Sequence, residues 1–353
     1  MLIHEDHKNH FISFFDEENG IYMRSGLLLD NRETEDPFMS DFPELLDIGI
    51  MGHCRHGISG KCLKANVECY QNGISQIEEN MSLEDFEMII KQCVGRTFQI
   101  ALGGRGDPDQ HEHFEDILKI CRYNDIVPNL TSSGYGFNDE IVHLCKKYCG
   151  AVAISWYRSD YTLKAINLLL KEKVKTNIHY VLNNKTIDEA IERLKNNDFP
   201  KGINAVIFLL HKPIGLGSKN QVLKVDDPKV IEFFHLIDNN SFDFKIGFDS
   251  CSIPGLINYT HSLDIERVDT CESGRWSAYI TPDMKMLPCS FDNQQQRWAV
   301  DLREYSIHDA WYSETFEEFR NHFIYSCPAC PQRLSCMGGC PISSDIVLCN
   351  KKS

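Results

Sequence analysis

The chain lacks any long hydrophobic run. Its longest apolar stretches, such as residues 203–210, have the length of a strand and fall far short of the ~20 residues that a membrane-spanning helix needs. Residues 1–15 are charged and rich in histidine, and they lack the apolar stretch of a secretory signal peptide. We therefore expect a cytoplasmic protein that does not contact a membrane.

Positive charge is also scarce. The 353 residues include 36 lysines and arginines against 51 aspartates and glutamates, which gives a net charge of -15. No stretch forms a local basic face, so a nucleic acid, whose phosphates would be repelled, is not an expected partner. Internal repeats and low-complexity segments are missing too, and a hydrophobic content of 42% fits a globular protein better than a disordered chain or a coiled coil.

Cysteine is the residue type in excess, with 15 in the chain. Disulfides are rare in a reducing compartment and the number is odd, so metal binding explains the excess better. Ten of these cysteines fall into two groups, one near the start and one in the last quarter: Cys54, Cys62 and Cys69, then Cys271, Cys289, Cys327, Cys330, Cys336, Cys340 and Cys349. Cys93, Cys121 and Cys145 lie on apolar faces of predicted helices, where we expect them in the core.

Short apolar runs alternate with amphipathic stretches from residue 46 to residue 210. This pattern predicts a parallel sheet with crossover helices. The expected strands are residues 46–51, 97–102, 127–131, 151–156, 175–181 and 205–210. Six strand–helix units suggest a partial (β/α)6 barrel, although periodicity alone does not separate it from a doubly wound sheet. Helix starts are predicted at Ser82, Asn138 and Thr186, which can cap free amides.

The loops after the predicted strands are polar or rich in glycine. The second strand ends in Gly103-Gly104-Arg105-Gly106-Asp107-Pro108, the third in Thr131-Ser132-Ser133-Gly134, and the fourth begins its loop at Ser155. In both candidate architectures a ligand binds at these carboxyl ends. Before the barrel, residues 11–15 and 21–23 flank an Asn19-Gly20 turn and predict a β-hairpin, and residues 31–44 form an acidic connector.

The carboxyl-terminal cysteines give the most specific pattern. Cys327-x2-Cys330-x5-Cys336-x3-Cys340, followed by Cys349, places five thiols among prolines and glycines, in a loop and not in a core. One structural zinc is the alternative, but seven cysteines exceed its four ligands. Together with Cys271 and Cys289, the spacing resembles that of the SPASM domain of radical S-adenosylmethionine (SAM) enzymes. Met284 stands where that family usually has glycine.

The resemblance implies two auxiliary 4Fe-4S clusters. Cys271, Cys289 and Cys340 would hold the first, and Cys327, Cys330, Cys336 and Cys349 the second. The first cluster then lacks a fourth protein ligand in this pattern. Either Cys251 supplies it, or the position is open to a substrate thiol.

The first cysteine group resembles the same family. Radical SAM enzymes bind a catalytic 4Fe-4S cluster through three cysteines after the first barrel strand, and Cys54, Cys62 and Cys69 lie there, although their x7 and x6 spacing is wider than the common x3 and x2. The resemblance assigns S-adenosyl-L-methionine binding to seven further residues: Tyr70, Gly103, Gly104, Asp107, Ser132, Ser133 and Ser155. Asp107 would receive the ammonium group of the cofactor, and Tyr70 would pack near its adenine.

The implied fold is a partial (β/α)6 barrel followed by a loop-rich SPASM domain, divided as residues 1–45, 46–248 and 249–353. The closest resemblance is to the radical SAM peptide maturases of the CXXX-repeat family. It implies a ribosomally made, Cys-rich precursor peptide as substrate, an electron donor such as flavodoxin or ferredoxin, and thioether formation through a 5'-deoxyadenosyl radical. The amino-terminal hairpin is a candidate for leader recognition at its edge.

Other hypotheses remain open at this point. A related enzyme could act on another protein, as sulfatase-maturing relatives do, or on a small molecule such as the precursor of a quinone cofactor. Sulfatase-maturing relatives carry an aspartate after the cysteine that corresponds to Cys289, whereas this chain has Ser290. A zinc-binding adaptor without catalysis would explain only the last cysteine group.

Overall fold

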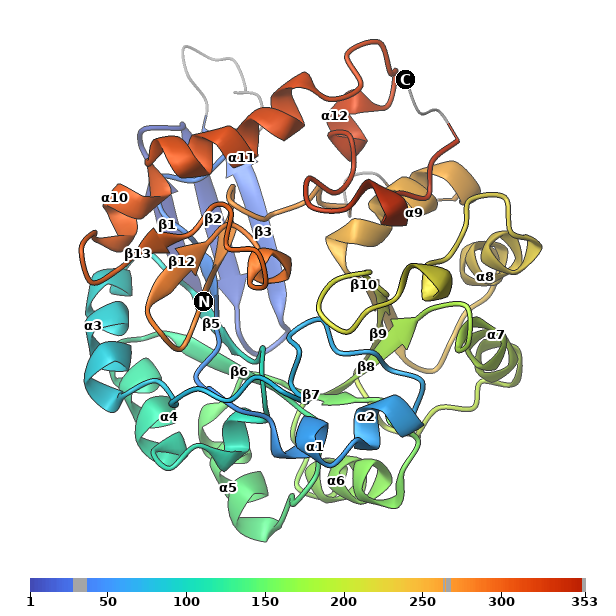
Figure 1. Ribbon diagram of the computed structural model, residues 1–353, viewed down its shortest axis with the longest axis horizontal. Coiled ribbons are helices and arrows are strands. Elements are labelled where there is room, and N and C mark those ends of the chain that lie inside the picture. Colours follow the sequence, from blue (N-terminus) through green and yellow to red (C-terminus); the bar gives the residue numbers. More distant parts are fainter. Residues whose placement is uncertain (28–36, 263, 265–267, 351–353) are drawn as a thin grey trace.

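The computed structural model describes residues 1–27, 37–262, 264 and 268–350. A parallel sheet with outer helices dominates the molecule (Figure 1). Its strands are β4 (Leu45–Ile48), β5 (Gln99–Leu102), β6 (Val127–Ser132), β7 (Val152–Ser155), β8 (Thr176–Leu182), β9 (Ala205–Leu210) and β10 (Lys245–Phe248). The six predicted strands are confirmed as β4 to β9, and β10 adds a seventh that pairs in parallel with β9.

The strand order decides the architecture that the sequence left open. Strands β4 to β10 are neighbours in chain order, so each crossover advances in the same direction and the sheet never reverses as a doubly wound sheet does. The helices consequently lie on one outer face, and the sheet curves into a partial barrel (Figure 1).

Helices α1 to α9 connect the barrel strands or follow them. Their bounds are α1 (Arg55–Ile58), α2 (Lys61–Lys64), α3 (Leu83–Cys93), α4 (Phe114–Tyr123), α5 (Asp139–Tyr148), α6 (Asp160–Lys171), α7 (Ile187–Asn196), α8 (Pro228–Asn239) and α9 (Ile253–Tyr259). Each long helix buries one apolar stripe, as Phe86, Ile89 and Cys93 do on α3. Cys93, Cys121 and Cys145 are fully buried, which confirms their predicted place in the core.

Two of the three predicted caps are confirmed. The side chains of Ser82 and Asn138 accept hydrogen bonds from amides in the first turns of α3 and α5. Thr186 does begin α7, but the predicted cap is wrong because its hydroxyl donates to the carbonyl oxygen of Val181 at 2.8 Å.

The carboxyl-terminal part continues the barrel sheet. Strand β11 (Ser277–Ile280) pairs in parallel with β4, and β12 (Lys285–Leu287) and β13 (Val300–Asp301) follow as antiparallel neighbours. Helices α10 (Ile307–Trp311), α11 (Glu314–Tyr325) and α12 (Arg333–Cys336) then cross the end of the barrel (Figure 1). One sheet therefore runs from the barrel into the Cys-rich region.

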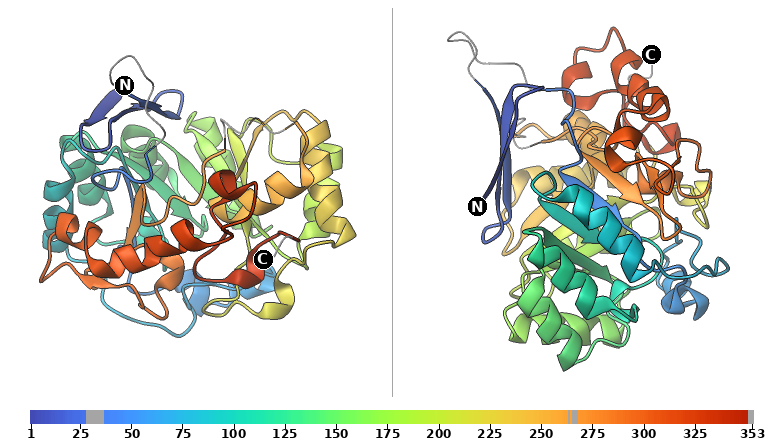
Figure 2. Two further views of the ribbon diagram at one scale, coloured as in Figure 1. Left: turned by 90° about the horizontal axis from the view of Figure 1, so that it is seen from above. Right: turned by 90° about the vertical axis from the view of Figure 1, so that its left-hand side faces the viewer.

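A separate antiparallel sheet precedes the barrel. Strands β2 (Phe11–Asp16) and β3 (Ile21–Gly26) form the predicted hairpin, and β1 (Leu2–Asp6) adds a third strand. Figure 2 shows this sheet standing against one side of the molecule. It packs through Phe15 on Phe98, which precedes β5, so it covers the amino ends of barrel strands. Part of the predicted connector, residues 31–36, lies outside the described residues, and none of the described helices is long and apolar enough to cross a membrane.

Candidate functional site

Three cysteines lie close together in the segment between β4 and α3. Cys54 precedes α1, and its Sγ accepts a hydrogen bond from the Gly57 amide at 3.0 Å. Cys62 is buried in α2, and Cys69 lies in the loop that follows. Burial raises the pKa of Cys54 to about 12, and the charges of Cys69 and Cys62 add to the increase.

Gly73 marks the space between two of these thiols. A Cβ atom on Gly73 would lie 3.5 Å from the Sγ of Cys54 and 3.7 Å from the Sγ of Cys69. It would also lie 2.9 Å from the Cβ of Cys54, which is closer than real Cβ contacts allow. The glycine therefore leaves open a cradle that two of the cysteines border.

Arg105 fastens both ends of this cysteine segment. Its guanidinium donates to the carbonyl oxygen of Gly52 at 3.1 Å and to that of Gln71 at 3.4 Å, and it pairs with Glu78 at 2.8 Å. The side chain is only 2% exposed. Gly52 precedes Cys54, and Gln71 follows Cys69. One arginine from the loop after β5 therefore holds both ends of the cysteine segment by hydrogen bonds.

Residues from the loops after three other strands donate hydrogen bonds to the backbone of the same segment. After β7, Arg158 donates to the carbonyl oxygen of Ala65 at 2.9 Å. After β8, Asn183 donates to that of Asn66 at 3.1 Å. After β9, the Leu216 amide donates to the carbonyl oxygen of Cys69 at 2.9 Å. The loops of the barrel thus fix the backbone of this long segment, because its widely spaced cysteines do not hold one another in place through local contacts.

Replacing Arg105 tests this role. Arg105→Met would leave the buried carbonyl oxygen of Gln71 without a donor, at a cost of about 1–3 kcal/mol, and would remove one of the two donors to the carbonyl oxygen of Gly52, which keeps the Glu78 amide. We expect a lower melting temperature and a marked loss of iron from the cluster predicted at Cys54, Cys62 and Cys69, measured by iron analysis and electron paramagnetic resonance. Arg303→Met, which removes a half-exposed arginine paired with Asp85, is the control and should keep its iron. Unchanged iron in Arg105→Met would contradict this role.

The residues predicted to bind SAM lie around the same segment. Asp107 is buried and accepts hydrogen bonds from the amide and the hydroxyl of Ser133, both at 2.6 Å. Burial raises the pKa of this carboxyl group. Ser132 ends β6 and Ser155 ends β7, while Gly103 and Gly104 follow β5, so all lie at carboxyl ends of neighbouring strands. Tyr70 packs on Phe291 with ring centroids 4.5 Å apart, and its contact with adenine stays a prediction.

Tyr157 also lies beside the three cysteines, although the sequence placed it only in a loop expected to bind a ligand and gave it no role of its own. It follows β7, and its ring packs on His56 with centroids 4.4 Å apart. Burial raises its pKa, with further increases from Cys62, Cys69 and Asp107. A phenol after a strand is not distinctive in a sequence, so only the fold reveals that it lies beside the three cysteines.

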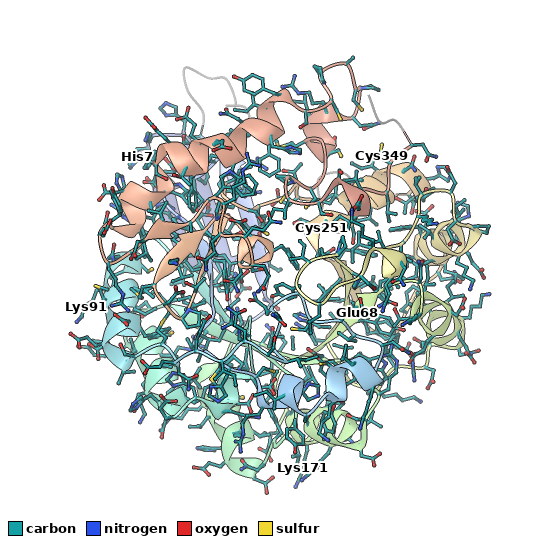
Figure 3. The ribbon with its side chains drawn as sticks, viewed as in Figure 1. His7, Glu68, Lys91, Lys171, Cys251 and Cys349 are labelled. Atoms are coloured by element: carbon teal, nitrogen blue, oxygen red, sulfur yellow. The ribbon has the colours of Figure 1, made fainter. Side chains whose placement is uncertain are left out.

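A second group of thiols lines a cavity of about 800 Å³ between the barrel and the carboxyl-terminal region. Its four cysteines are Cys251, Cys271, Cys289 and Cys340. A hydrogen bond between Cys251 and Cys340, together with burial, raises the pKa of Cys251, and burial raises that of Cys271 to about 11. Cys251 therefore lies with the three thiols that the sequence assigned to one cluster. Figure 3 labels it near the centre of the molecule.

A third group lines a separate cavity of about 320 Å³. Its cysteines are Cys327, Cys330, Cys336 and Cys349, the set predicted for the second auxiliary cluster. Cys349 lies nearer the edge of the molecule than Cys251 (Figure 3). Among the described residues, no three His, Cys, Asp or Glu side chains converge on a point that would hold a single metal ion. Thiols that surround a cavity suit a multi-atom cluster better than one tetrahedral zinc ion.

The turn before Cys289 explains a departure from the family pattern. Met284 lies between β11 and β12 with a φ of +69°, in the left-handed region that favours glycine. Its side chain is fully buried, so packing offsets the backbone cost. The turn therefore keeps the conformation that glycine would give.

Two buried cations near the larger group of thiols, Lys212 and Arg275, have partners inside the protein. Lys212 is buried and pairs with Asp249, and its amino group lies 4.4 Å from the ring centroid of Phe291. Arg275 donates to the hydroxyl of Thr270 at 2.5 Å and to the carbonyl oxygen of Cys271 at 3.1 Å. Arg275 thereby fixes the backbone at Cys271, one of the cysteines predicted to hold the first auxiliary cluster.

Comparison with known proteins agrees with this arrangement. Residues 271–336 match SPASM, an iron-sulfur cluster-binding domain. No curated protein matches the chain in sequence.

Solved structures resemble most of this chain in fold. The crystal structure of Streptococcus suis SuiB bound to precursor peptide SuiA is 15% identical in sequence and has a TM-score of 0.65. The match covers 86% of this chain and 72% of the SuiB chain. The structure of SuiB bound to S-adenosylmethionine is 15% identical in sequence and also has a TM-score of 0.65. The match covers 89% of this chain and 77% of SuiB. The structure of native anSMEcpe with bound AdoMet and Kp18Cys peptide is 17% identical in sequence and has a TM-score of 0.59. The match covers 88% of this chain and 92% of anSMEcpe. Residues 271–336 of this chain are thus similar to a SPASM iron-sulfur cluster-binding domain, and its overall fold is similar to those of SuiB and anSMEcpe, each of which has been solved with bound S-adenosylmethionine.

Proposed function

We propose that the chain is a peptide maturase that uses SAM and three 4Fe-4S clusters to modify a ribosomally made, Cys-containing precursor peptide. The observation that carries this proposal is the grouping of eleven cysteines into one group of three and two cavities each lined by four. Thiolates are the usual protein ligands of such clusters, and a site with three of them leaves one iron for another ligand. The likeness in fold to SuiB and anSMEcpe, each solved with a peptide, supports a peptide substrate.

The cysteine groups suggest separate roles. Cys54, Cys62 and Cys69 would hold the cluster that binds SAM, and Asp107 lies near Cys54, where an acceptor for the ammonium group is needed. Cys251 would complete the first auxiliary cluster with Cys271, Cys289 and Cys340. When bound, these groups would supply a SAM-derived radical that removes hydrogen from carbon, and a route for the electron that leaves the substrate.

Four protein thiols around the first auxiliary site also bear on the mechanism. A cluster with four protein ligands has no open iron for a substrate thiolate, so we favour electron acceptance as its role. The protein would then orient the peptide and exclude water from the cavity. A thioether product would lack two hydrogens, one from carbon and one from the thiol, because one sulfur–carbon bond replaces a C–H and an S–H bond.

A precursor-peptide assay tests this function. We expect the reconstituted enzyme, incubated with SAM, dithionite and a Cys-repeat peptide encoded beside its gene, to lower the peptide mass by about 2 Da for each thioether. Modified cysteines should also resist alkylation by iodoacetamide. Deuterium placed on the attacked carbon should appear in 5'-deoxyadenosine. An unmodified peptide together with a converted sulfatase peptide would favour the sulfatase-maturing alternative.

A further inference from the structure

The described charged side chains that line the cavity beside Cys251 are all acidic. The cavity lies in the gap between β10 and β11, and six carboxyl side chains line it. They are Asp47, Asp238, Asp249, Asp264, Asp269 and Glu272. The described residues that line the cavity include no lysine, arginine or histidine. Four cluster-bound thiolates would make this region more negative still.

Several of these carboxylates have partners of their own. Asp249 pairs with Lys212, and Asp269 pairs with Arg24. Asp238 accepts hydrogen bonds from the amides of His261 and Ser262, both at 2.9 Å. Asp47 and Glu272 are different, because neither carboxyl group has an ion pair or a hydrogen bond with a described residue. Two partly buried carboxyl groups without partners cost stability, so support of the fold does not explain them.

Strand β4 and the segment after Cys271 position the two carboxyl groups. Asp47 projects from β4, and Tyr279 is its register partner on the neighbouring strand β11. Glu272 directly follows Cys271. The phenol oxygen of Tyr279 is buried and has no hydrogen-bond partner among the described residues. A Cβ atom on Gly49 would lie 2.4 Å from this oxygen, so a glycine makes room for it. Two carboxyl groups and a phenol, all without partners, thus line one cavity.

We propose that this cavity selects a substrate peptide with a cationic side chain, and that the ammonium group of a lysine or the guanidinium group of an arginine binds between Asp47 and Glu272. This inference rests on the proposed peptide substrate and specifies one of its residues. Apolar side chains of the same cavity, Ile246, Phe248 and Ala278, can cover the methylene groups of such a residue. The cation would be held beside the auxiliary cysteines and would place the neighbouring peptide segment there.

A binding experiment with a peptide library tests this selection without requiring catalysis. The full chain, reconstituted anaerobically and immobilised, is incubated with peptides that carry a fixed central cysteine and two random residues on each side. Retained peptides are sequenced by mass spectrometry. We expect lysine and arginine to be enriched at least about threefold at one flanking position on the wild type. Asp47→Asn/Glu272→Gln should abolish this enrichment.

A matched control separates local from general charge effects. Glu84→Gln/Glu140→Gln removes the same charge from exposed positions on α3 and α5 and should keep the enrichment. The cavity variant should melt no lower than the wild type, because it neutralises two partly buried carboxyl groups without partners. Retained peptides without cation enrichment on the wild type, or enrichment that persists in the cavity variant, would overturn the inference. If the wild type retained no peptide at all, the proposed peptide-maturing function itself would be contradicted.

Discussion

Gly73→Ala is expected to remove the catalytic cluster and abolish 5'-deoxyadenosine formation. Its Cβ atom would lie 2.9 Å from the Cβ of Cys54 and within 3.7 Å of the Sγ atoms of Cys54 and Cys69. The added methyl group would occupy the cradle and push the two thiols apart. We expect about four fewer irons per chain and at least a hundredfold slower cleavage of SAM, with both auxiliary clusters retained.

Gly60→Ala is the matched control for that prediction. Gly60 lies in the same segment at a φ of +69°, and a Cβ atom on it would meet no atom within 4 Å. Alanine at this left-handed position should cost about 1 kcal/mol of stability and leave the iron content unchanged. Full iron in Gly73→Ala would contradict the placement of the catalytic cluster. Equal iron loss in both variants would indicate a general fault in the segment instead.

Cys251→Ala should separate SAM cleavage from peptide modification. If Cys251 is the fourth ligand of the first auxiliary cluster, its loss opens or empties that site, while Cys54, Cys62 and Cys69 still hold theirs. We expect 5'-deoxyadenosine formation within about threefold of wild type, an altered electron paramagnetic resonance signal, and peptide modification reduced at least tenfold.

Cys121→Ala provides the comparison for Cys251→Ala. Cys121 is fully buried on α4, away from the three cysteine groups, so its replacement should lower the melting temperature and leave the iron content unchanged. An auxiliary signal and peptide modification that both remain normal in Cys251→Ala would contradict the four-thiol site. They would favour the alternative in which a substrate thiol completes that cluster.

Local patterns were sufficient to predict most of the barrel. Strand β9 has its predicted bounds, and β5 to β8 differ by one or two residues at their ends. Strand β10 was missed because Lys245–Phe248 is short and only partly buried, so neither alternation nor a long apolar run marks it. The pairing of β11 with β4 joins residues more than two hundred positions apart, and a local pattern carries no signal for such a contact.

The sequence likewise predicted part of the candidate site, and the rest depends on contacts between distant segments. The resemblance to the SPASM domain predicted the group of four thiols that lines the smaller cavity, and these cysteines are close in sequence. It left open whether Cys251 belongs to the larger cavity, because that cysteine follows β10 and joins the others only through the fold. The close approach at Gly73 and the bridging role of Arg105 depend on backbone atoms from distant loops. A sequence names such residues but does not show what they touch.

Iron, acid-labile sulfide and zinc, measured per chain on anaerobically reconstituted protein, test the central claim most directly. Eleven cysteines in one group of three and two groups of four predict about twelve irons with matching sulfide, and no zinc. About one or two zinc ions without sulfide would contradict the claim and would instead support a zinc-binding adaptor.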